Sequence, residues 1–365
     1  MALNTLPNAG LTNRGYPSDR ITTPIIINGD MSVDQRNGTS TINGTSVTYN
    51  VDRFLGRGVS SAGVFTLAQD TTAPAGFTNS LKATVTTADS SIASGSSYRV
   101  QHLVEGNNSS YLYWGNSGAE TVTLSFYVRS SVTGTFGGSF ANGDFNRFNV
   151  FSYTINQADT WERKVVNITG DTSGTWPTNN TLAIRINWSL GAGSTLLDSA
   201  GSWGSSTKEG VTSQTNLIAT NSATWYITGV QLEVGEFDST SIPSFPFESY
   251  ANNLQKCFRY YELLASGNAL TLGFGGTYNS NHPAYAIYYH PKRAVPSLDE
   301  VNSSNYYRFY SSGVEYKYNV SSQFFQATIT QAMIINGNAG TVADDKVGFF
   351  DTINSGAYLA LDAEL

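Results

Sequence analysis

Apolar and polar residues alternate along much of this chain. The two clearest runs are Val122, Leu124, Phe126 and Val128, and then Leu182, Ile184, Ile186, Trp188 and Leu190. Successive side chains of a strand point to opposite faces of a sheet, so a period of two predicts antiparallel strands with one buried and one solvated face. Many short runs of this kind, separated by turns rich in Gly, Asn, Thr and Ser, predict a β-sandwich.

One predicted strand near the middle of the chain contains a break in this alternation. Trp225 and Ile227 follow the period of two, whereas Val230 and Leu232 continue it one position out of phase. Gly229 lies at the break, where a β-bulge would keep both sets of side chains facing the core. The sequence therefore predicts a bulge at Gly229.

Residues 248–265 follow a different period. Their apolar residues, spaced by three and four, are Tyr250, Leu254, Cys257, Phe258, Tyr261 and Leu264. This spacing predicts a short amphipathic helix of about four turns. Because its apolar stripe would lie between two β domains, we expect Leu254, Phe258 and Tyr261 to contact other copies of the chain in a homotrimer.

Together these patterns predict an all-β protein with two β-sandwich domains of jelly-roll type, joined by one short amphipathic helix and preceded by an extended N-terminal arm. The predicted boundaries are 1–23 for the arm, 24–247 for the first sandwich, 248–265 for the connecting helix and 266–365 for a smaller distal sandwich. A chain of 365 residues is long enough for two domains of this kind.

The predicted arm carries Leu11, Tyr16 and Ile21 at intervals, together with Arg14. Two interpretations are open. The arm is either a frayed terminus or a docking segment that binds another protein through these four residues.

Composition narrows the classes of function. Charged residues make up 13% of the chain and the net charge is −7, with Lys and Arg spread singly. A nucleic-acid partner needs clustered cations, so this distribution argues against one. The single cysteine, Cys257, permits no intrachain disulfide. Neither a secretory signal nor an apolar run of about 20 residues occurs, so we expect synthesis in a cytoplasm and no membrane insertion.

No motif indicates catalysis. The chain has three histidines, none spaced as a pair of metal ligands, and it contains neither a nucleophile elbow nor a phosphate-binding loop. Acidic residues such as Asp144 and Asp171 follow glycines in turns, where local hydrogen bonding explains them. We therefore expect no enzyme activity and no cofactor. A glycan depolymerase, which would use two carboxylates, stays a lesser alternative.

Three aromatic residues are candidates for stacking on sugars. Trp176 and Trp203 lie in loop-like runs rich in Gly, Ser, Thr and Asn, and Tyr111 leads into a turn. Flat rings stack on the faces of sugars, but aromatic residues beside strands equally pack into a core. Both interpretations are open for these residues.

A second candidate site lies where the first and last strands of the first domain would meet. Asn28, Asp30 and Glu233 carry the oxygen ligands that Ca²⁺ prefers. Ordinary polarity of turns and strand ends explains the same residues, and we expect no metal there.

The segment from Asn28 to Asn37, NGDMSVDQRN, is similar to the opening NGDM.IDQRN of a large group of phage and prophage tail-fibre and virion-surface proteins. Further segments continue the resemblance in the same order, namely residues 75–82, 122–138, 160–176, 227–235, 246–248 and 257–261. The last of these resembles the family's CQRYY helix. The resemblance is strong over residues 24–265 and loose over 266–365.

This resemblance implies a jelly roll like that of carbohydrate-binding modules, in a non-catalytic phage virion protein such as a trimeric tail fibre or spike that binds host-surface glycans. It implies a place on the virion surface after synthesis in the bacterial host cytoplasm. Other tail or capsid proteins would be partners through residues 1–23. A capsid decoration or head-fibre protein with a purely structural role is the alternative.

Overall fold

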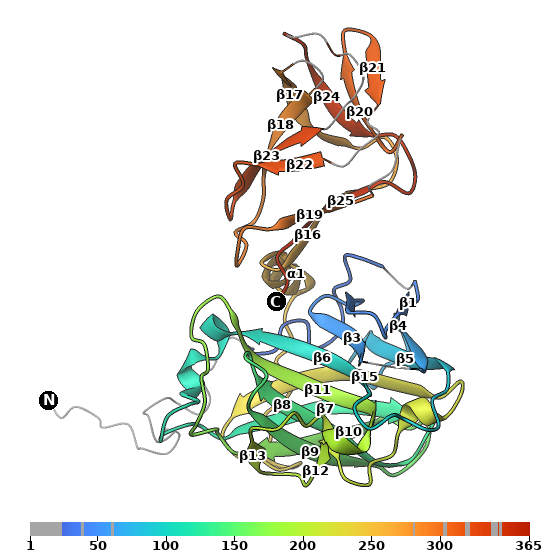
Figure 1. Cartoon of the computed structure of the whole chain (residues 1–365), viewed down its shortest axis with the longest axis vertical. Coiled ribbons are helices and arrows are strands. Elements are labelled where there is room, and N and C mark those ends of the chain that lie inside the picture. The colour runs from blue at the N-terminus through green and yellow to red at the C-terminus, as the bar shows by residue number, and fades with distance from the viewer. Residues whose placement is uncertain are drawn as a thin grey trace, which may run out of the picture. The chain divides into compact units, whose positions relative to one another are not determined.

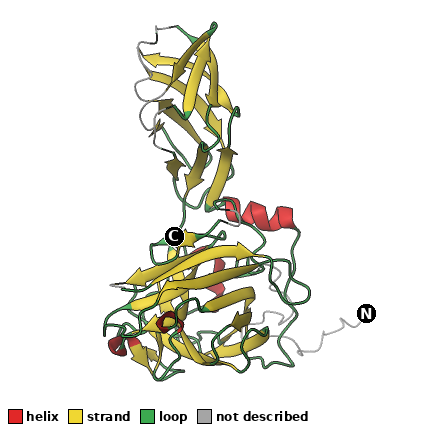
Figure 2. Cartoon of the chain, turned by 90° about the vertical axis from the view of Figure 1, so that its right-hand side faces the viewer, coloured by secondary structure: helices red, strands yellow, loops and turns green. Residues whose placement is uncertain are grey.

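The computed structural model describes residues 24–365 except 38–39, 60–61, 280–281, 302–304, 318–321, 337–341 and 343–344. The chain divides into two compact units, Met1–Ser249 and Tyr250–Leu365. Strands dominate both units (Figure 2). The described residues contain one α-helix. The all-β prediction is therefore confirmed.

The predicted docking arm, with Leu11, Arg14, Tyr16 and Ile21, lies outside the described residues. In the part of the chain that is described, no helix is both long enough and apolar enough to cross a bilayer.

The first unit contains two antiparallel sheets that share one core (Figure 1). The six-stranded sheet has the order β1-β4-β5-β15-β7-β10. Its strands are β1 (Ile42–Asn43), β4 (Val64–Asp70), β5 (Ser80–Thr87), β7 (Val122–Ser130), β10 (Glu162–Ile168) and β15 (Thr224–Val234).

The seven-stranded sheet of this unit has the order β13-β9-β8-β11-β6-β3-β2. Its strands are β2 (Thr48–Tyr49), β3 (Phe54–Val59), β6 (Ser97–Glu105), β8 (Gly134–Asn142), β9 (Phe148–Ile155), β11 (Leu182–Ala192) and β13 (Trp203–Gly204). The connections contain a parallel pair, β12 (Leu197–Asp198) and β14 (Gly210–Val211), and the 3-10 helices η1 (Gly106–Asn108), η2 (Ser110–Leu112), η3 (Ser194–Leu196) and η4 (Leu217–Ala219).

Aromatic rings join the two layers of the first unit. Trp188 on β11 is wholly buried, and its ring centre lies 6.3 Å from that of Phe54 on β3 and 5.8 Å from that of Phe126 on β7. Phe126 belongs to the six-stranded sheet, so the three rings connect both sheets. Burying one Phe side chain contributes roughly 1.5–3 kcal/mol relative to leaving it exposed. The alternating positions from Val122 to Val128 are all buried, as predicted.

The predicted bulge in β15 is confirmed. The pairing of β15 with β7 shifts register between Thr228 and Gln231, and Gly229 has a φ of 60°. The shift lets Ile227 before the bulge and Val230 after it both point into the core. A Cβ at Gly229 would lie 2.7 Å from the ring of Phe77, so only glycine fits this position without rearrangement.

The second unit is also built from two antiparallel sheets. The three-stranded sheet, in the order β16-β25-β19, is made of β16 (Tyr261–Ser266), β19 (Ser297–Glu300) and β25 (Tyr358–Asp362). The seven-stranded sheet, in the order β21-β20-β24-β17-β18-β23-β22, is made of β17 (Thr271–Asn279), β18 (His282–Tyr288), β20 (Tyr307–Ser311), β21 (Val314–Lys317), β22 (Ser322–Phe325), β23 (Gln331–Asn336) and β24 (Val347–Thr352). Phe309 and Phe350 from the larger sheet share a core with Leu359 and Leu361 from the smaller one.

The predicted helix is wrong beyond Phe258. Helix α1 covers Tyr250–Phe258, and the chain turns at Tyr260 and enters β16. Apolar residues three apart in this stretch fit a strand with a register shift as well as a helix, and pairing with β25 decides the outcome. Tyr261 is 2% exposed, and its hydroxyl donates to Asp299 at 3.1 Å. Tyr261 therefore belongs to the interior of the second unit rather than to a helical surface.

Of the other two residues predicted to contact further copies, Leu254 and Phe258 lie on α1 and are half-buried. The ring of Phe258 stacks on that of His290, with 4.5 Å between the ring centres. His290 belongs to the same unit, so one face of the Phe258 ring is already covered.

Candidate functional site

The two tryptophans singled out as sugar-stacking candidates lie together in one cluster. Trp176 and Trp203 pack edge-on to each other and to Trp114, with ring centres 4.7–5.5 Å apart. The indole N–H groups of Trp114, Trp176 and Trp203 donate to backbone carbonyls at 2.8, 3.0 and 2.7 Å, respectively. The hollow beside Trp114 and Trp176 measures about 10 Å³, which is the space of a single water. These contacts make the cluster a cap on the core.

Tyr111 lies on η2, three residues before Trp114, and is half-buried. Burial raises the pKa of its hydroxyl, and the nearby carboxylate of Glu233 raises it further. Burial likewise raises the pKa of Glu233. The structure thus brings Tyr111 and Glu233 near each other, although the sequence assigned them to different candidate sites.

The two remaining calcium candidates shape a turn. The side-chain carbonyl of Asn28 accepts the backbone N–H of Val33 at 2.9 Å, and its amide donates to the carbonyls of Val33 and Asp52. Asp30 accepts the hydroxyl of Ser32 at 2.9 Å. Within the described residues, no three His, Cys, Asp or Glu side chains gather as a metal site would require.

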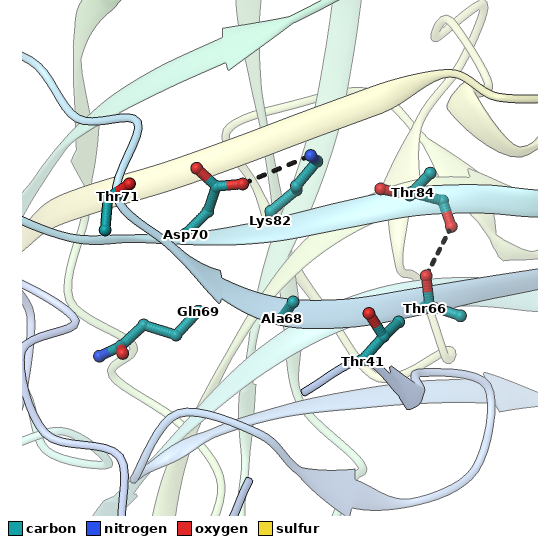
Figure 3. Close-up of a pocket in the computed structure, with 8 residues that line it drawn as sticks. All are labelled: Thr41, Thr66, Ala68, Gln69, Asp70, Thr71, Lys82 and Thr84. Carbon is teal, nitrogen blue, oxygen red and sulfur yellow. Dashed lines mark hydrogen bonds and ion pairs between the residues drawn. The ribbon is translucent and has the colours of Figure 1, made fainter. Parts of the chain in front are cut away.

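A polar groove of about 320 Å³ opens on the solvent side of β4 and β5 (Figure 3). The residues that line it are Thr41, Thr66, Ala68, Gln69, Asp70, Thr71, Lys82 and Thr84. Alternation explains this lining, because Phe65 and Leu67 on β4 and Leu81 and Ala83 on β5 point into the core. Thr66 and Asp70 on β4 and Lys82 and Thr84 on β5 therefore face outward and supply hydroxyl, carboxylate and ammonium groups. Gln69 has the parity of the core residues, and its amide donates to the carbonyl of Met31 at 2.7 Å.

An ion pair lies at one end of this groove. The amine of Lys82 is 3.3 Å from the carboxylate of Asp70, and Figure 3 shows them on neighbouring strands. Burial opposes both charges. Hydrogen bonds from Thr72 and the charge of Lys82 nevertheless lower the pKa of Asp70, and Tyr226 and Asp70 raise the pKa of Lys82. Both groups are therefore charged at neutral pH.

The ring of Tyr226 underlies the same cation. The amine of Lys82 lies 5.3 Å from the centre of this ring, and the guanidinium of Arg129 lies 4.9 Å from it. Tyr226 is 6% exposed, and the two cations and the ring of Trp161 pack against it. The groove thus offers hydrogen-bonding groups rather than a bare aromatic face.

Several segments that carry the family resemblance converge at a different place. The ring of Phe77 lies 5.1 Å from that of Phe245 and 5.0 Å from that of Phe247, and it fits against the bulge at Gly229. The backbone N–H of Val230 donates to the carbonyl of Gly29 at 2.9 Å. These motif residues therefore fasten the segment that follows β15, which is a structural role.

On the outer face of the seven-stranded sheet in the first unit, several buried polar side chains bond to one another. Gln101, Asn187 and Ser139 form a hydrogen-bonded row across β6, β11 and β8, with distances of 2.5 and 2.8 Å. Arg99 forms a buried ion pair with Glu209 at 2.5 Å. Burial lowers the pKa of Arg99 to about 10, against the opposing charge of Glu209, so the guanidinium stays charged at neutral pH.

Sequence reasoning did not single out Asp70, Lys82, Thr66 or Thr84. Alternation predicts the strands that carry these residues. It does not predict their register, which pairs Ala68 with Lys82 and Thr66 with Thr84. Two short polar strands with no turn of fixed length between them leave that register open in the sequence.

No protein-family model matches the chain, and no curated protein matches it. Among solved structures, a Bacteroides thetaiotaomicron protein to which sugar binding has been ascribed is 13% identical, with a TM-score of 0.36, and covers 58% of this chain and 100% of its own. The enzymatically active domain of tailspike protein 4 from bacteriophage CBA120 is 12% identical, with a TM-score of 0.29, over 53% of this chain and 21% of its own.

The family 11 carbohydrate-binding module of a Clostridium thermocellum cellulosomal cellulase is 9% identical, with a TM-score of 0.28, over 56% of this chain and 99% of its own. All three TM-scores lie below 0.5, so the functional proposal depends on the chain's own residues.

Proposed function

We propose that this chain is a bacteriophage virion-surface protein, such as a tail fibre or spike, whose first unit binds host-surface glycans without cleaving them. The ordered motifs between residues 28 and 261 support the assignment to a virion. A homotrimer displayed on the particle and docked through residues 1–23 is part of the same proposal. The observation that carries the binding function is the polar groove on β4 and β5.

The chemistry of this groove fits a hydroxyl-rich ligand. A sugar hydroxyl both donates and accepts, so neighbouring hydroxyls can donate to the carboxylate of Asp70 while accepting from the ammonium of Lys82, 3.3 Å away. The hydroxyl of Thr84 can donate or accept, and the hydroxyl of Thr66, which donates to the carbonyl of Thr84 at 3.4 Å, can accept. Binding sites for small ligands start at about 300 Å³, and this groove reaches that size.

The same groove does not fit glycoside hydrolysis. A glycosidase places two carboxyl groups about 5–9.5 Å apart, one of which is kept protonated to act as an acid. The described lining contains one carboxylate, Asp70, and its pKa is lowered rather than raised. Binding without cleavage is the function that these groups support.

We expect the full-length chain to bind one or more host polysaccharides on a glycan array. Asp70→Asn removes the charged acceptor and should weaken binding roughly 10-fold to 100-fold, the range for a hydrogen bond to a charged group. Thr84→Val should also weaken binding. Thr86→Val is the matched control, because Thr86 is the next outward residue of the same strand and lies outside the groove lining.

Failure of the wild-type chain to bind any host polysaccharide would refute the glycan proposal. Equal binding by Thr84→Val and Thr86→Val would place the ligand elsewhere. Release of reducing ends from a bound polysaccharide would support the depolymerase instead.

A second candidate, a capsid decoration or head-fibre protein with a structural role, is favoured by the tryptophan cluster. The rings of Trp176 and Trp203 contact each other, and their N–H groups donate to backbone carbonyls. These internal contacts indicate packing rather than ligand binding. Labelled antibody against the first unit, imaged on intact particles, separates a tail position from a capsid position.

A further inference from the structure

One face of the second unit carries an exposed set of large apolar side chains. We call it the aromatic face and define it by Phe274, Tyr278, Tyr288, Tyr310, Phe325, Val347 and Phe349. In that order their exposed fractions are 60%, 54%, 77%, 38%, 37%, 65% and 52%. All seven lie on strands of the seven-stranded sheet.

Strand register places these residues side by side. Tyr310 on β20 pairs with Phe349 on β24, which pairs with Phe274 on β17. At the other edge Met333 on β23 pairs with Phe325 on β22. Paired residues point to the same side of a sheet, so the row runs across the sheet from β20 to β22.

Ring contacts join residues within this face. The ring centres of Phe274 and Phe349 are 5.5 Å apart, and those of Tyr278 and Phe325 are 5.6 Å apart. The residue after Phe349 is Phe350, which is wholly buried in the core on the opposite side of the sheet. The alternation of the strand therefore supplies a core on one side and a second apolar surface on the other.

The exposed area matches what an interface needs. Aromatic side chains bury roughly 150–250 Å² each, so the exposed fractions leave on the order of 700 Å² of this face in contact with water. The largest apolar patch of an ordinary monomer is about 300–600 Å², whereas a stable protein interface buries about 800 Å² on each partner. The aromatic face exceeds the first range and approaches the second value.

Charges of both signs lie at the rim of the face, beside Tyr310. Arg308 lies 5.2 Å from the centre of the Tyr310 ring and pairs with Asp351 at 3.2 Å and with Glu315. Lys317 lies 3.9 Å from Glu315. A rim that carries acids and bases together is complementary to a second rim of the same composition, and not to a uniformly charged partner.

We propose that the aromatic face is the surface through which copies of this chain associate. A glycan is a poor occupant, because Phe and Val offer no hydrogen bonds to the hydroxyls that would be dehydrated there. An anionic lipid surface is a poor occupant for a chain of net charge −7. A second copy supplies the same apolar area and the same mixed rim.

In the proposed homotrimer, three copies of the face turn toward one three-fold axis, and each face meets both neighbours. This surface replaces the helical stripe as the proposed contact, because Tyr261 is interior and Phe258 is covered by His290. Self-association and glycan binding use different residues in different units, so either can fail while the other holds.

The test uses the full-length chain and the double substitution Phe274→Thr with Phe349→Thr. Threonine keeps the preference for strand while removing the exposed rings. Light scattering of the wild-type chain should give a multiple of 39.3 kDa, and the double variant should dissociate at a concentration on the order of 100-fold higher. Val295→Thr is the control, because Val295 is 56% exposed but lies outside the sheet.

A wild-type chain that stays at 39.3 kDa at every concentration overturns the proposal. So does a double variant that associates as tightly as the wild type while its circular dichroism is unchanged. A monomer that binds lipid vesicles or glycans through Phe274 and Phe349 also overturns it, by identifying another occupant. If the double variant loses association but keeps its glycan-array signal, the interface is supported and the groove is unaffected.

Discussion

The two units differ in how many large apolar side chains they expose to solvent. Among the described residues, the first unit exposes three of them, Val47, Tyr113 and Phe247, and the second unit exposes the other twelve although it is the smaller unit. The described part of the first unit therefore leaves few large apolar side chains in contact with water. The second has a core of its own on one side of its larger sheet and an uncovered apolar surface on the other.

The difference arises on the solvent side of two sheets, the six-stranded sheet of the first unit and the seven-stranded sheet of the second. In the first unit, the outward ring of Tyr226 lies under Lys82 and Arg129, and that of Tyr127 lies under Arg163. Long cationic side chains cover a ring while keeping their charge in water. On the aromatic face of the second unit, Arg308 covers only Tyr310 at the rim, so the remaining rings need a partner.

The largest expected effects on stability come from substitutions in two buried ion pairs, Arg99–Glu209 in the first unit and Lys292–Glu262 in the second. Glu209→Gln leaves the charge of Arg99 buried without its partner, and we expect the first unit to lose about 3–5 kcal/mol. Glu262→Gln likewise removes the charged partner of Lys292 in the second unit. Burial lowers the pKa of Lys292, against the effect of Glu262, so this amine can shed its proton and the loss should be smaller.

Urea unfolding followed separately for the two units measures both losses. The deficit of Glu262→Gln should also shrink as pH rises toward the ordinary pKa of lysine, because the folded state of that variant favours the neutral amine. The deficit of Glu209→Gln should change less below pH 10, because the pKa of Arg99 is about 10 and its guanidinium keeps most of its proton below that pH. Equal and pH-independent losses would contradict the distinction between the two pairs.

A smaller effect tests the motif residues of the first unit. Gly229→Ala places a Cβ 2.7 Å from the ring of Phe77 at a φ of 60°, and we expect a loss of about 2–3 kcal/mol. Gly201→Ala is the matched control, because Gly201 also has a positive φ but has open space around its Cβ position. The control should lose about 1 kcal/mol, from the backbone alone. The unfolding transition of the second unit should not move in either variant.

The sequence predicted what depends on local periodicity. Alternation located the strands that contain Phe126 and Trp188, and the phase break located the bulge at Gly229. Sequence did not predict which strands pair. Ala68 and Lys82 become partners only through the register of β4 and β5, which is why the groove was missed.

Two further differences have tertiary causes. Trp176 and Trp203 lie in Gly- and Ser-rich loops that look exposed in the sequence, but the fold brings both onto Trp114. The apolar spacing at Tyr261 suits a helix and a strand alike, and pairing with β25 selects the strand. The aromatic face could not be predicted either, because alternation shows that a strand has two apolar sides without showing what covers the second one.

The smallest expected effect concerns acid stability, where the first unit should be the more sensitive. Glu162 accepts the backbone N–H groups of Asn156 and Gln157 and the amine of Lys164, at 2.6–3.0 Å. Burial opposes its charge, but these hydrogen bonds lower the pKa of Glu162 to about 2, from an ordinary value of 4.5. A carboxylate with a lowered pKa stabilises the folded state above its ordinary pKa, and that contribution disappears as pH falls from 4.5 toward 2.

Glu162→Gln should therefore cost the first unit about 1 kcal/mol at pH 7, where the carboxylate is charged and partly screened by solvent. The wild type and the variant should converge as pH falls through the same window. They will not become insensitive to acid, because the pKa values of Asp70 and Asp238 are also lowered by hydrogen bonds in this unit. Chemical denaturation at several pH values measures the gap between the two proteins. A gap that stays constant down to pH 2 would mean that the contribution of Glu162 does not come from its charge, and it would remove the electrostatic part of the contrast between the units.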